Sequence, residues 1–315
     1  MRIAVTGGAG FIGKHVLDWL IAHEHEVIVI DDLSRGRREH VPPQLTFLKF
    51  DLSRITASEL AGHFDHAKVE AVIYLAGTHF IPDCMRNPER TFEINTQGTH
   101  TLLEAVRLSA VSRMVFASTM DVYAVADRVH SETDTLKPSN IYGLTKALSE
   151  QMLQYAVYVG ACESAVALRL ANVYGPNETN PHVIPDAIER IVKRDEPALV
   201  MGYLGSARDF VYVKDVARAF GLAATRAPAG FWPLNTGTGH SIPVRTVIRT
   251  LQNMLGDTRL LQENPAAFRQ FDRESLTPNV DAIARVLGWR AETQLAEGLN
   301  ATIQGIRSKP VHQAA

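Results

Sequence analysis

Cysteine is scarce in this sequence. Only two cysteines, Cys84 and Cys162, occur among 315 residues, and they stand far apart. This scarcity excludes a disulfide-stapled scaffold and a cysteine-rich metal site, and it predicts free thiols in a reducing compartment. The first predicted strand begins at the second residue, so we expect no cleaved leader. We therefore expect a cytoplasmic protein.

An excess of one charge and long apolar runs are also missing. The 32 Lys and Arg residues nearly balance the 34 Asp and Glu residues, which leaves a formal net charge of −2. That balance excludes the basic surface typical of proteins that bind nucleic acids or membranes. No apolar run approaches the ~20 residues that a membrane helix requires. His63 and His66 have no third ligand at a suitable spacing, so we expect no metal, no nucleic acid and no membrane partner.

A glycine-rich turn follows the first predicted strand. Gly7, Gly10 and Gly13 lead from this strand into an apolar-periodic helix expected over residues 11–20. Glycines at this spacing allow a tight turn, a close approach of backbone N–H groups to a pyrophosphate, and close packing of helix on strand. The second predicted strand ends in Asp31, near the offset of about 20 residues at which a carboxylate holds a ribose diol. The pattern predicts a dinucleotide-binding site.

Strand-like and helix-like segments alternate through the first half of the chain. The expected strands are Arg2–Val5, Val27–Asp31, Leu45–Phe50, Ala71–Ala76, Arg113–Ser118 and Ala165–Leu170. With 46% hydrophobic residues, the chain has enough apolar sequence for one large α/β domain and a smaller one. Repeated strand–helix units predict an α/β fold, a Rossmann-type doubly wound parallel sheet, whose ligands bind beyond the carboxyl ends of the strands.

The pattern changes near residue 172, where turn-rich segments separate shorter helices. We expect the dinucleotide-binding Rossmann domain in residues 1–171, rejoined by about 209–236. A smaller C-terminal substrate-binding lobe is expected in 172–208 and 237–306, followed by a loose tail in 307–315.

Tyr142 and Lys146 are four residues apart at the start of another predicted helix, so they lie on one face. A phenol with its ordinary pKa of ~10 is a poor base near neutral pH. A neighbouring ammonium and a positively charged nicotinamide both favour the phenolate and lower that pKa. Such a pair can take a proton from a substrate hydroxyl. Ser118 and Thr119, at the end of a predicted strand, can bind and orient the same oxygen.

Together these motifs resemble the extended short-chain dehydrogenase/reductase family, the NAD-dependent nucleotide-sugar epimerases and dehydratases. The resemblance extends over almost the whole chain. The family's T-G-x-x-G-x-x-G motif matches Thr6–Gly13, and its Y-x-x-x-K motif matches Tyr142 and Lys146. Further matches, in the family order, are Asp51-Leu52, Leu75-Ala76-Gly77, Asn95 to Thr99, Val115 to Thr119, Arg169 to Pro176, Arg208 to Asp215, and Asn235 to Gly237.

The resemblance implies NAD as the cofactor and a nucleotide-diphosphate sugar, above all a UDP-sugar, as the substrate. Tyr142 is then the base, Lys146 bonds the nicotinamide ribose, and Thr119 supplies the catalytic hydroxyl. The implied cofactor-binding residues are Gly7, Gly10, Phe11, Ile12, Asp31, Asp32, Asp51, Leu52, Leu75, Ala76, Gly77, Asn95, Ser118, Tyr142 and Lys146. The implied substrate-binding residues are His79, Thr119, Asn172, His182, Val183 and Arg208.

Two further properties follow from the resemblance. Asp31 favours NAD over NADP, because a carboxylate bonds the ribose diol and repels a 2′-phosphate. Family members often dimerise through helices that correspond to residues 96–109 and 145–158 of this chain, which implies a homodimer.

The sequence leaves the reaction type open. All branches of the family oxidise the sugar at C4 to a 4-keto intermediate. An epimerase then returns hydride to the other face of the ketone, and it needs only Thr119, Tyr142 and Lys146. A dehydratase carries Thr-Asp-Glu at this position and a UDP-glucuronate decarboxylase carries Thr-Ser-Glu, whereas this chain has Thr119-Met120-Asp121.

Met120 cannot donate a proton, so we favour a 4-epimerase. The alternative is a 4,6-dehydratase or a decarboxylase that uses Asp121 as catalytic base, and the short loop 177–185 is typical of those enzymes. A third interpretation, a regulator that binds dinucleotide without turnover, is disfavoured because such proteins are expected to lose Tyr142 or Lys146.

Overall fold

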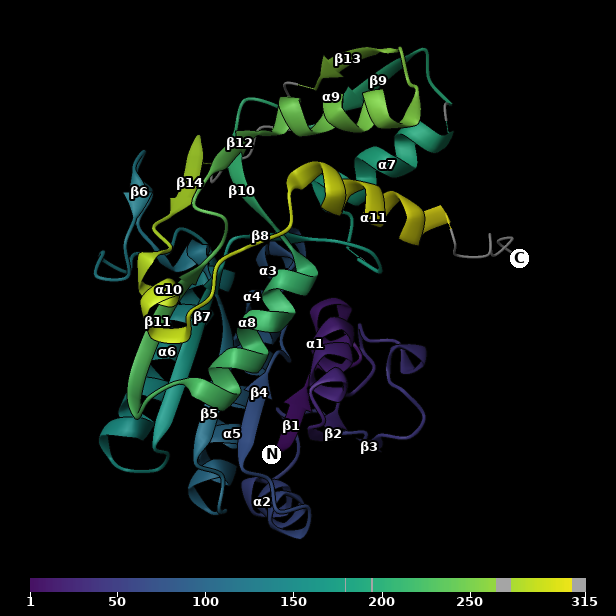
Figure 1. Cartoon of the computed structure of the whole chain (residues 1–315). Coiled ribbons are helices and arrows are strands. Elements are labelled where there is room, and N and C mark those ends of the chain that lie inside the picture. Colours follow the sequence, from purple (N-terminus) through teal and green to yellow (C-terminus); the bar gives the residue numbers. More distant parts are fainter. Residues whose placement is uncertain (179, 194, 265–272, 308–315) are drawn as a thin grey trace.

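A seven-stranded parallel sheet organises the chain (Figure 1). The computed structural model describes residues 1–178, 180–193, 195–264 and 273–307. The strand order is β11-β7-β5-β4-β1-β2-β3, so the chain winds outward from β1 in both directions. Every neighbouring pair is parallel. The strands are β1 (Arg2–Thr6), β2 (Glu26–Ile30), β3 (Thr46–Leu48), β4 (Ala71–Tyr74), β5 (Arg113–Thr119), β7 (Ser164–Leu170) and β11 (Gly230–Thr236).

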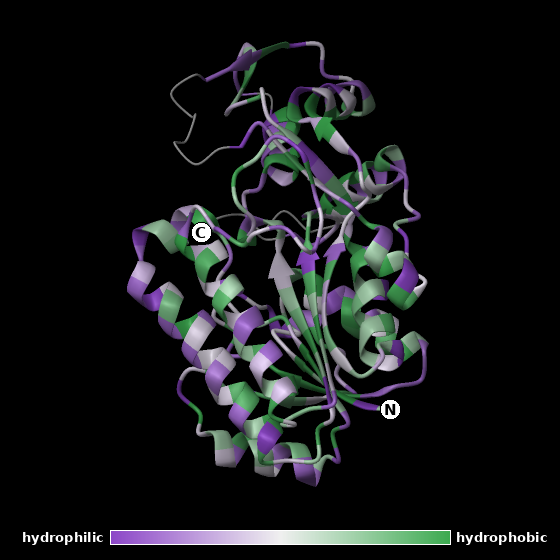
Figure 2. Ribbon diagram, turned by 90° about the vertical axis from the view of Figure 1, so that its left-hand side faces the viewer, coloured by the Kyte–Doolittle hydropathy of each residue, from purple (hydrophilic) through white to green (hydrophobic). Residues whose placement is uncertain are grey.

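Helices cover both faces of this sheet. On one face they are α1 (Phe11–Ala22), α8 (Val213–Arg226) and α10 (Asp281–Leu287). On the other face they are α2 (Ala57–His66), α5 (Gly98–Arg107) and α6 (Ile141–Tyr158). Strands covered on both faces are apolar along most of their length, and Figure 2 shows this apolar centre between helices with polar outer sides.

The turn between β1 and α1 depends on glycine at two positions. Gly7 has a φ of +71°, in the left-handed region, and a Cβ there would lie 2.6 Å from the backbone nitrogen of Ala76. A Cβ at Gly13 would collide with the Gly7 carbonyl oxygen. The glycines therefore bring α1 close against the turn after β1, as the sequence motif predicts, and bring this turn close against the segment after β4.

A smaller lobe lies beyond the carboxyl ends of the main strands (Figure 1). It contains a five-stranded sheet, a two-stranded sheet and a core of its own. Its strands are β6 (Val129–His130), β8 (Asn172–Tyr174), β9 (Ala198–Met201), β10 (Ala207–Tyr212), β12 (Ser241–Pro243), β13 (Leu260–Glu263) and β14 (Ser275–Pro278). Its helices are α7 (Val183–Lys193), α9 (Val244–Leu255) and α11 (Leu295–Arg307).

Short helical segments line the connections. They are η1 (Arg38–His40), α3 (Ile81–Arg86), α4 (Pro88–Phe92), η2 (Glu93–Gln97) and η3 (Met120–Val122). None of the helices in the described ranges is long and apolar enough to cross a membrane.

The boundaries between the two parts differ from the expected residue ranges in three places. β6 was expected within the dinucleotide-binding domain, but it pairs with β14 in the lobe sheet. β10 was expected to rejoin the main domain, but it pairs within the lobe sheet, and only α8 and β11 return to the main sheet. α10 was expected in the lobe, yet Ile283 and Trp289 belong to the core of the main sheet. The Trp289 indole N–H donates to the Asp215 carbonyl at 2.9 Å, which fastens this segment to α8. The expected tail lies outside the described residues, apart from Arg307 at the end of α11.

Candidate functional site

A cavity of about 760 Å³ lies at the carboxyl edge of the main sheet, where the lobe meets it. The glycine turn, the ends of β2, β4 and β5, the start of α6 and the start of α7 all contribute to its wall. With one exception, every residue expected from the sequence to bind cofactor or substrate lines this cavity. The topology thus brings together residues that are far apart in the sequence.

The glycine turn leaves the N-terminus of α1 open to a ligand. Gly10 is the N-cap residue, and no side chain of the described residues caps this end. Among these residues, a Cβ at Gly10 would meet only the Gly7 carbonyl oxygen, at 3.2 Å, so the backbone here is accessible from the cavity. Free N–H groups at a helix N-terminus attract anions, and the turn therefore fits a pyrophosphate.

Asp31 lies at the end of β2, beside the glycine turn. Its carboxylate accepts hydrogen bonds from the backbone N–H groups of Ala9, at 3.0 Å, and Leu33, at 2.8 Å. Burial raises the pKa of Asp31, while these two hydrogen bonds act against the rise. The carboxylate keeps free lone pairs and lines the cavity, so it can also accept from a ribose diol. Asp32 beside it accepts from the Ser34 hydroxyl at 2.6 Å.

Asp51 and Leu52 follow β3 in the chain, and both line the cavity. Arg90 on α4 donates to the Asp51 carboxylate at 3.1 Å, and Ser53 donates from its hydroxyl at 2.7 Å. Although burial acts to raise it, these hydrogen bonds hold the pKa of Asp51 below its ordinary value. Arg90 also lines the cavity, a contribution that the sequence motifs do not predict.

Asn95 is the one expected residue that does not line the cavity. Its side chain bonds both the N–H and the carbonyl of Thr78, each at 2.9 Å, and the Thr145 hydroxyl at 3.0 Å. These bonds tie the loop after β4 to α6. The structure therefore places Asn95 behind the cavity wall, where it holds the loop that carries Leu75 to Gly77 instead of facing the expected cofactor.

Three side chains form a reactive group at the centre of the cavity. The Tyr142 hydroxyl is hydrogen-bonded to Thr119 at the end of β5. The Lys146 ammonium lies 5.9 Å from the centre of the Tyr142 ring and 4.6 Å from that of Phe116. Asn140 caps α6 by accepting from the Gly143 N–H at 2.8 Å, which fixes the first turn of the helix that carries both residues.

Burial is the largest cause of the pKa shifts of both Tyr142 and Lys146. Lys146 is only 4% exposed, and burial lowers its pKa to about 8. Burial, with the charge of Asp121, raises the pKa of Tyr142. From the sequence, the Lys146 ammonium and a bound nicotinamide are expected to lower the pKa of Tyr142. In the protein without its cofactor the pKa of Tyr142 is instead raised. Desolvation, together with the Asp121 charge, sets this direction, and the Thr119 hydrogen bond acts against it.

Met120 and Asp121 have different surroundings. Met120 also lines the cavity, but its side chain packs in a small apolar cluster with Val122 and Tyr123 and has no proton to donate. Asp121 lies in the cavity wall and is hydrogen-bonded to Thr119 and Asn140. Burial raises its pKa, against the charges of two arginines, Arg273 and Arg208. Asp121 is therefore part of the reactive group and not a surface acid.

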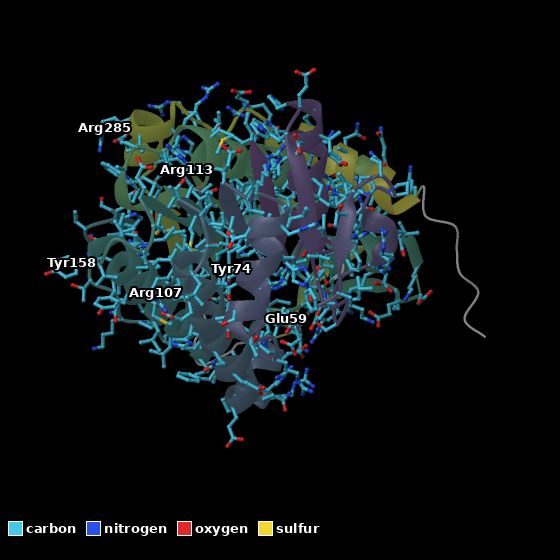
Figure 3. The ribbon with its side chains drawn as sticks, turned by 90° about the horizontal axis from the view of Figure 1, so that it is seen from below. Glu59, Tyr74, Arg107, Arg113, Tyr158 and Arg285 are labelled. Atoms are coloured by element: carbon cyan, nitrogen blue, oxygen red, sulfur yellow. The ribbon has the colours of Figure 1, made fainter. Side chains whose placement is uncertain are left out.

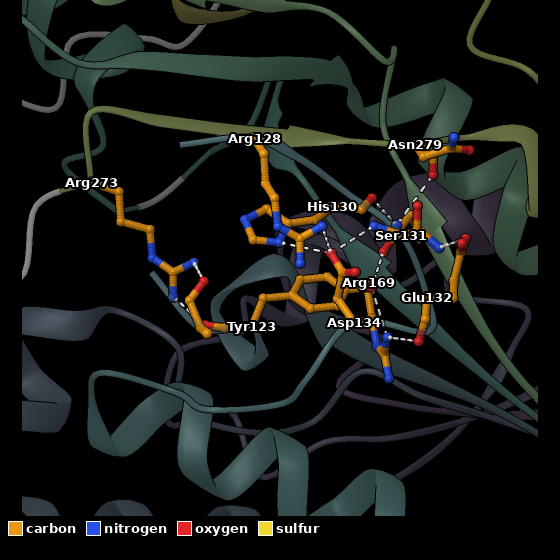
Figure 4. Close-up of polar contacts among 11 residues, drawn as sticks. Tyr123, Arg128, His130, Ser131, Glu132, Asp134, Arg169, Arg273 and Asn279 are labelled. Carbon is orange, nitrogen blue, oxygen red and sulfur yellow. Dashed lines mark hydrogen bonds and ion pairs between the residues drawn. The ribbon is translucent and has the colours of Figure 1, made fainter. Parts of the chain in front are cut away.

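A buried polar network lies behind the reactive group, and Figure 4 shows the part of it around Tyr123 and Arg169. Ser118 donates to Glu150, which forms an ion pair with Arg169 at 2.7 Å. Arg169 also donates to the Tyr123 hydroxyl at 2.7 Å, and this hydroxyl donates to Asn235 at 2.6 Å. The Ser118 hydroxyl, expected to contact cofactor, is thereby committed to the network.

The lobe and the loop after β4 form the other half of the cavity wall. His79, Asn172, His182, Val183 and Arg208 all line it, as expected from the sequence. An Arg208 N–H donates to the carbonyls of Ala207 and Arg273, each at 2.8 Å, so its guanidinium is held at the cavity wall. Within the described ranges, no group of three or more His, Cys, Asp or Glu residues could hold a metal ion.

Residues 3–232 match the model of the NAD dependent epimerase/dehydratase family. The chain belongs to this family.

Relatives within the family carry different activities. A UDP-glucose 4-epimerase of Azospirillum brasilense is 32% identical, over 95% of this chain and 89% of its own. A UDP-glucuronic acid decarboxylase 1 of Xenopus tropicalis is 31% identical, over 99% of this chain and 74% of its own. The solved structure of Thermus thermophilus UDP-glucose 4-epimerase in complex with NAD has a TM-score of 0.88 at 31% identity, over 98% and 99% of the chains. These matches confirm the family and the Rossmann-type α/β fold predicted from the sequence.

Several cavity and support residues of this family member were missed by sequence reasoning. Glu150 stands four residues after Lys146, so helical spacing could have placed it on the same face. Arg90, Glu178 and Arg273 stand in no motif that the sequence analysis used, and only the folded chain brings them to the site.

Proposed function

We propose that the chain is an NAD-dependent nucleotide-sugar 4-epimerase. The observation that carries the proposal is the meeting of Thr119, Tyr142 and Lys146 in one cavity with an uncapped glycine turn. Tyr142 has the position to take the proton of a sugar hydroxyl, and Thr119 to hold the oxygen. Bound NAD supplies the reversible hydride acceptor. The UDP-glucose 4-epimerases among the relatives support this reaction and a UDP-sugar as the substrate.

The residues at the glycine turn fit the cofactor. The open N-terminus of α1 suits the pyrophosphate, and Asp31 suits the adenosine ribose diol. Lys146 beside Tyr142 suits the nicotinamide ribose, with its ammonium also favouring a phenolate. Residues 1–171 without β6, together with α8, β11 and α10, thus form the proposed cofactor domain, and the lobe forms the proposed sugar-nucleotide domain.

The position of Asp121 supports a second candidate reaction, that of a 4,6-dehydratase. Asp121 is hydrogen-bonded to Thr119 and lies close enough to Tyr142 for its charge to act on the tyrosine. A carboxylate there can remove the proton next to a 4-keto group, as a 4,6-dehydratase requires. Met120, buried in apolar surroundings, offers no acid for the leaving hydroxyl, and this favours epimerisation.

The outer sides of α5 and α6 support a homodimer. Tyr155 and Tyr158 on α6 are 65% and 85% exposed, and Leu108 and Val159 beside the helix ends are exposed as well. Figure 3 shows Tyr158 at the edge of the molecule, pointing outward. Such exposed apolar side chains are typical of a helix face that a partner covers. We also place the protein in the cytoplasm, which its two free, buried cysteines support.

The test is incubation with UDP-, dTDP- and GDP-sugars, followed by mass spectrometry of the products. An isomer of unchanged mass is expected, above all from a UDP-hexose. Loss of water identifies a dehydratase, and loss of carbon dioxide identifies a decarboxylase. Binding without turnover of any of these sugars contradicts an enzymatic role.

A further inference from the structure

Next to the reactive group, the cavity wall contains a cluster that no motif accounts for. It consists of His79, Glu178, Asn180 and His182, and we refer to it as the acid–histidine cluster. His79 lies within electrostatic range of Lys146, which places the cluster at the catalytic end of the cavity and not at the end of Asp51. Three members, His79, Glu178 and His182, line the cavity.

The histidine nearest Lys146 is neutral and fully engaged. The His79 side chain is exposed toward the cavity, and the protein atoms crowded around it, with the charges of His182 and Lys146, lower its pKa. Its imidazole is hydrogen-bonded to the Gly77 backbone and, at 3.0 Å, to the Asn180 amide. His79 therefore holds the loop before α7 in place and offers no charge to a ligand.

Glu178 is the member with unused bonding capacity. Its side chain is 3% exposed, and one carboxylate oxygen accepts from the His182 ring nitrogen at 2.9 Å. The other oxygen, Oε2, is buried and has no hydrogen-bond partner among the described residues. A buried oxygen without a hydrogen-bond partner lowers the stability of the folded protein. A ligand that donates a hydrogen bond to this oxygen removes that destabilisation, and its binding is favoured by the same amount.

We propose that Glu178 selects the sugar: its free oxygen accepts from a hydroxyl or amine of the hexose, and its charge rejects a uronate. The proposal rests on the 4-epimerase function proposed above and narrows its substrate to neutral or amino hexoses. Burial raises the pKa of Glu178, so a second carboxylate beside it adds repulsion to an already unfavourable charge. A donor from the sugar stabilises the same charge.

The discrimination matters because relatives act on both kinds of sugar. One similar protein is a UDP-glucose epimerase and another is a UDP-glucuronic acid decarboxylase. Both substrates share the nucleotide and the ring, and they differ in whether C6 bears a hydroxyl or a carboxylate. The acid–histidine cluster supplies an acceptor with negative charge, which matches the hydroxyl.

Calorimetric titration of the NAD-loaded enzyme tests this assignment. The Tyr142→Phe background prevents turnover, and the probes are UDP-glucose, UDP-glucuronate and UDP. We expect UDP-glucose to bind at least about tenfold more tightly than UDP-glucuronate, since like charges meet only in the second complex. Adding Glu178→Gln, which keeps the shape of the side chain, is expected to bring this ratio close to one.

A matched control is Glu189→Gln on α7, where the carboxylate is 62% exposed and paired with Lys193. It is expected to leave the ratio unchanged, and UDP alone is expected to bind all variants equally. A ratio that Glu178→Gln does not change, or a wild-type preference for the uronate, overturns the assignment and leaves the 4-epimerase proposal standing. If UDP-glucose binds no more tightly than UDP in any variant, the Glu178 assignment fails, whereas the 4-epimerase proposal fails only when no sugar nucleotide yields an isomer of unchanged mass.

Discussion

Tyr142 is the residue at which the proposed chemistry is most directly tested. Its hydroxyl bonds Thr119 inside the cavity, and replacement by Phe removes only that oxygen. We predict that Tyr142→Phe lowers kcat by about 10²- to 10⁴-fold, the usual contribution of a general base, and leaves NAD content unchanged. Steady-state rates and the absorbance of released cofactor measure the two effects. Wild-type rates in this variant would remove Tyr142 as the base.

Lys146 carries a prediction about pH. Its pKa falls from an ordinary 10.5 to about 8 in the folded protein, because burial disfavours its charge. Below about pH 8 folding therefore carries a penalty of about 3 kcal/mol, which fades as pH rises from about 8 to about 10.5 and the unfolded lysine also loses its proton. We predict that Lys146→Met stabilises the fold at pH 7 by up to this amount, and much less at pH 10.

Chemical denaturation at the two pH values measures this gain. Lys193→Met is the control, because that lysine is 58% exposed and its replacement should change stability little. An equal gain for Lys146→Met at both pH values would show that packing and not charge is responsible.

Asp31 separates cofactor binding from substrate binding. Hydrogen bonds to a charged group contribute about 1.5–3 kcal/mol, so Asp31→Asn is expected to weaken NAD binding by about 10- to 100-fold. Sugar-nucleotide binding should change little, since Asp31 lies at the β2 end of the cavity. Fluorescence titration with each ligand is the measurement, and equal weakening of both would contradict the assignment.

At the scale of elements, the β1–α1 turn and α2 provide a matched pair of glycine substitutions. Gly7→Ala forces a left-handed φ on alanine and drives its Cβ into the Ala76 backbone, so we predict a loss of about 3 kcal/mol or more and loss of NAD binding. Gly62 lies inside α2 with nothing described within 4 Å of a Cβ. Gly62→Ala is therefore expected to stabilise the protein by about 0.5–1 kcal/mol. Thermal unfolding compares them, and similar effects of both would contradict the steric argument.

The main elements could be predicted because their patterns are local. The strands and helices of the Rossmann sheet carry their periodicity and their glycines in sequence, and the structure confirms this fold. β6, β10 and α10 were misplaced because their partners are distant in the chain. The Trp289 indole fastens α10 by a bond to Asp215, and no local signal in the sequence marks that contact.

The residues of the site also fall into two groups, those that sequence motifs predict and those that only the folded chain reveals. Motif residues such as Tyr142 and Asp31 could be named in advance, since their spacing reflects turn and helix geometry. Asn95 does not line the cavity, and its motif could not reveal this because a motif does not show which way an amide points. Glu178 and Arg273 could not be found, since each acquires its role from a fold-dependent neighbour, His182 for one and Asp121 for the other.

At the scale of the whole molecule, the exposed tyrosines of α6 predict the oligomeric state. We expect the wild-type protein to sediment as a dimer and the double variant Tyr155→Glu, Tyr158→Glu to sediment as a folded monomer, because buried charge opposes the interface. Val192→Glu is the control, since Val192 is 54% exposed on α7 and far from that face in sequence. A monomeric wild type in analytical ultracentrifugation would contradict the dimer.

The packing of Trp289 against α8 has a consequence for how the protein is made. The first strands of the main sheet leave the ribosome long before Ile283 and Trp289, yet these two residues fill the core of that sheet. During synthesis this core remains incomplete until residue 289 has emerged. A nascent chain stalled before residue 281 would therefore expose an apolar groove beside α8 to chaperones and proteases.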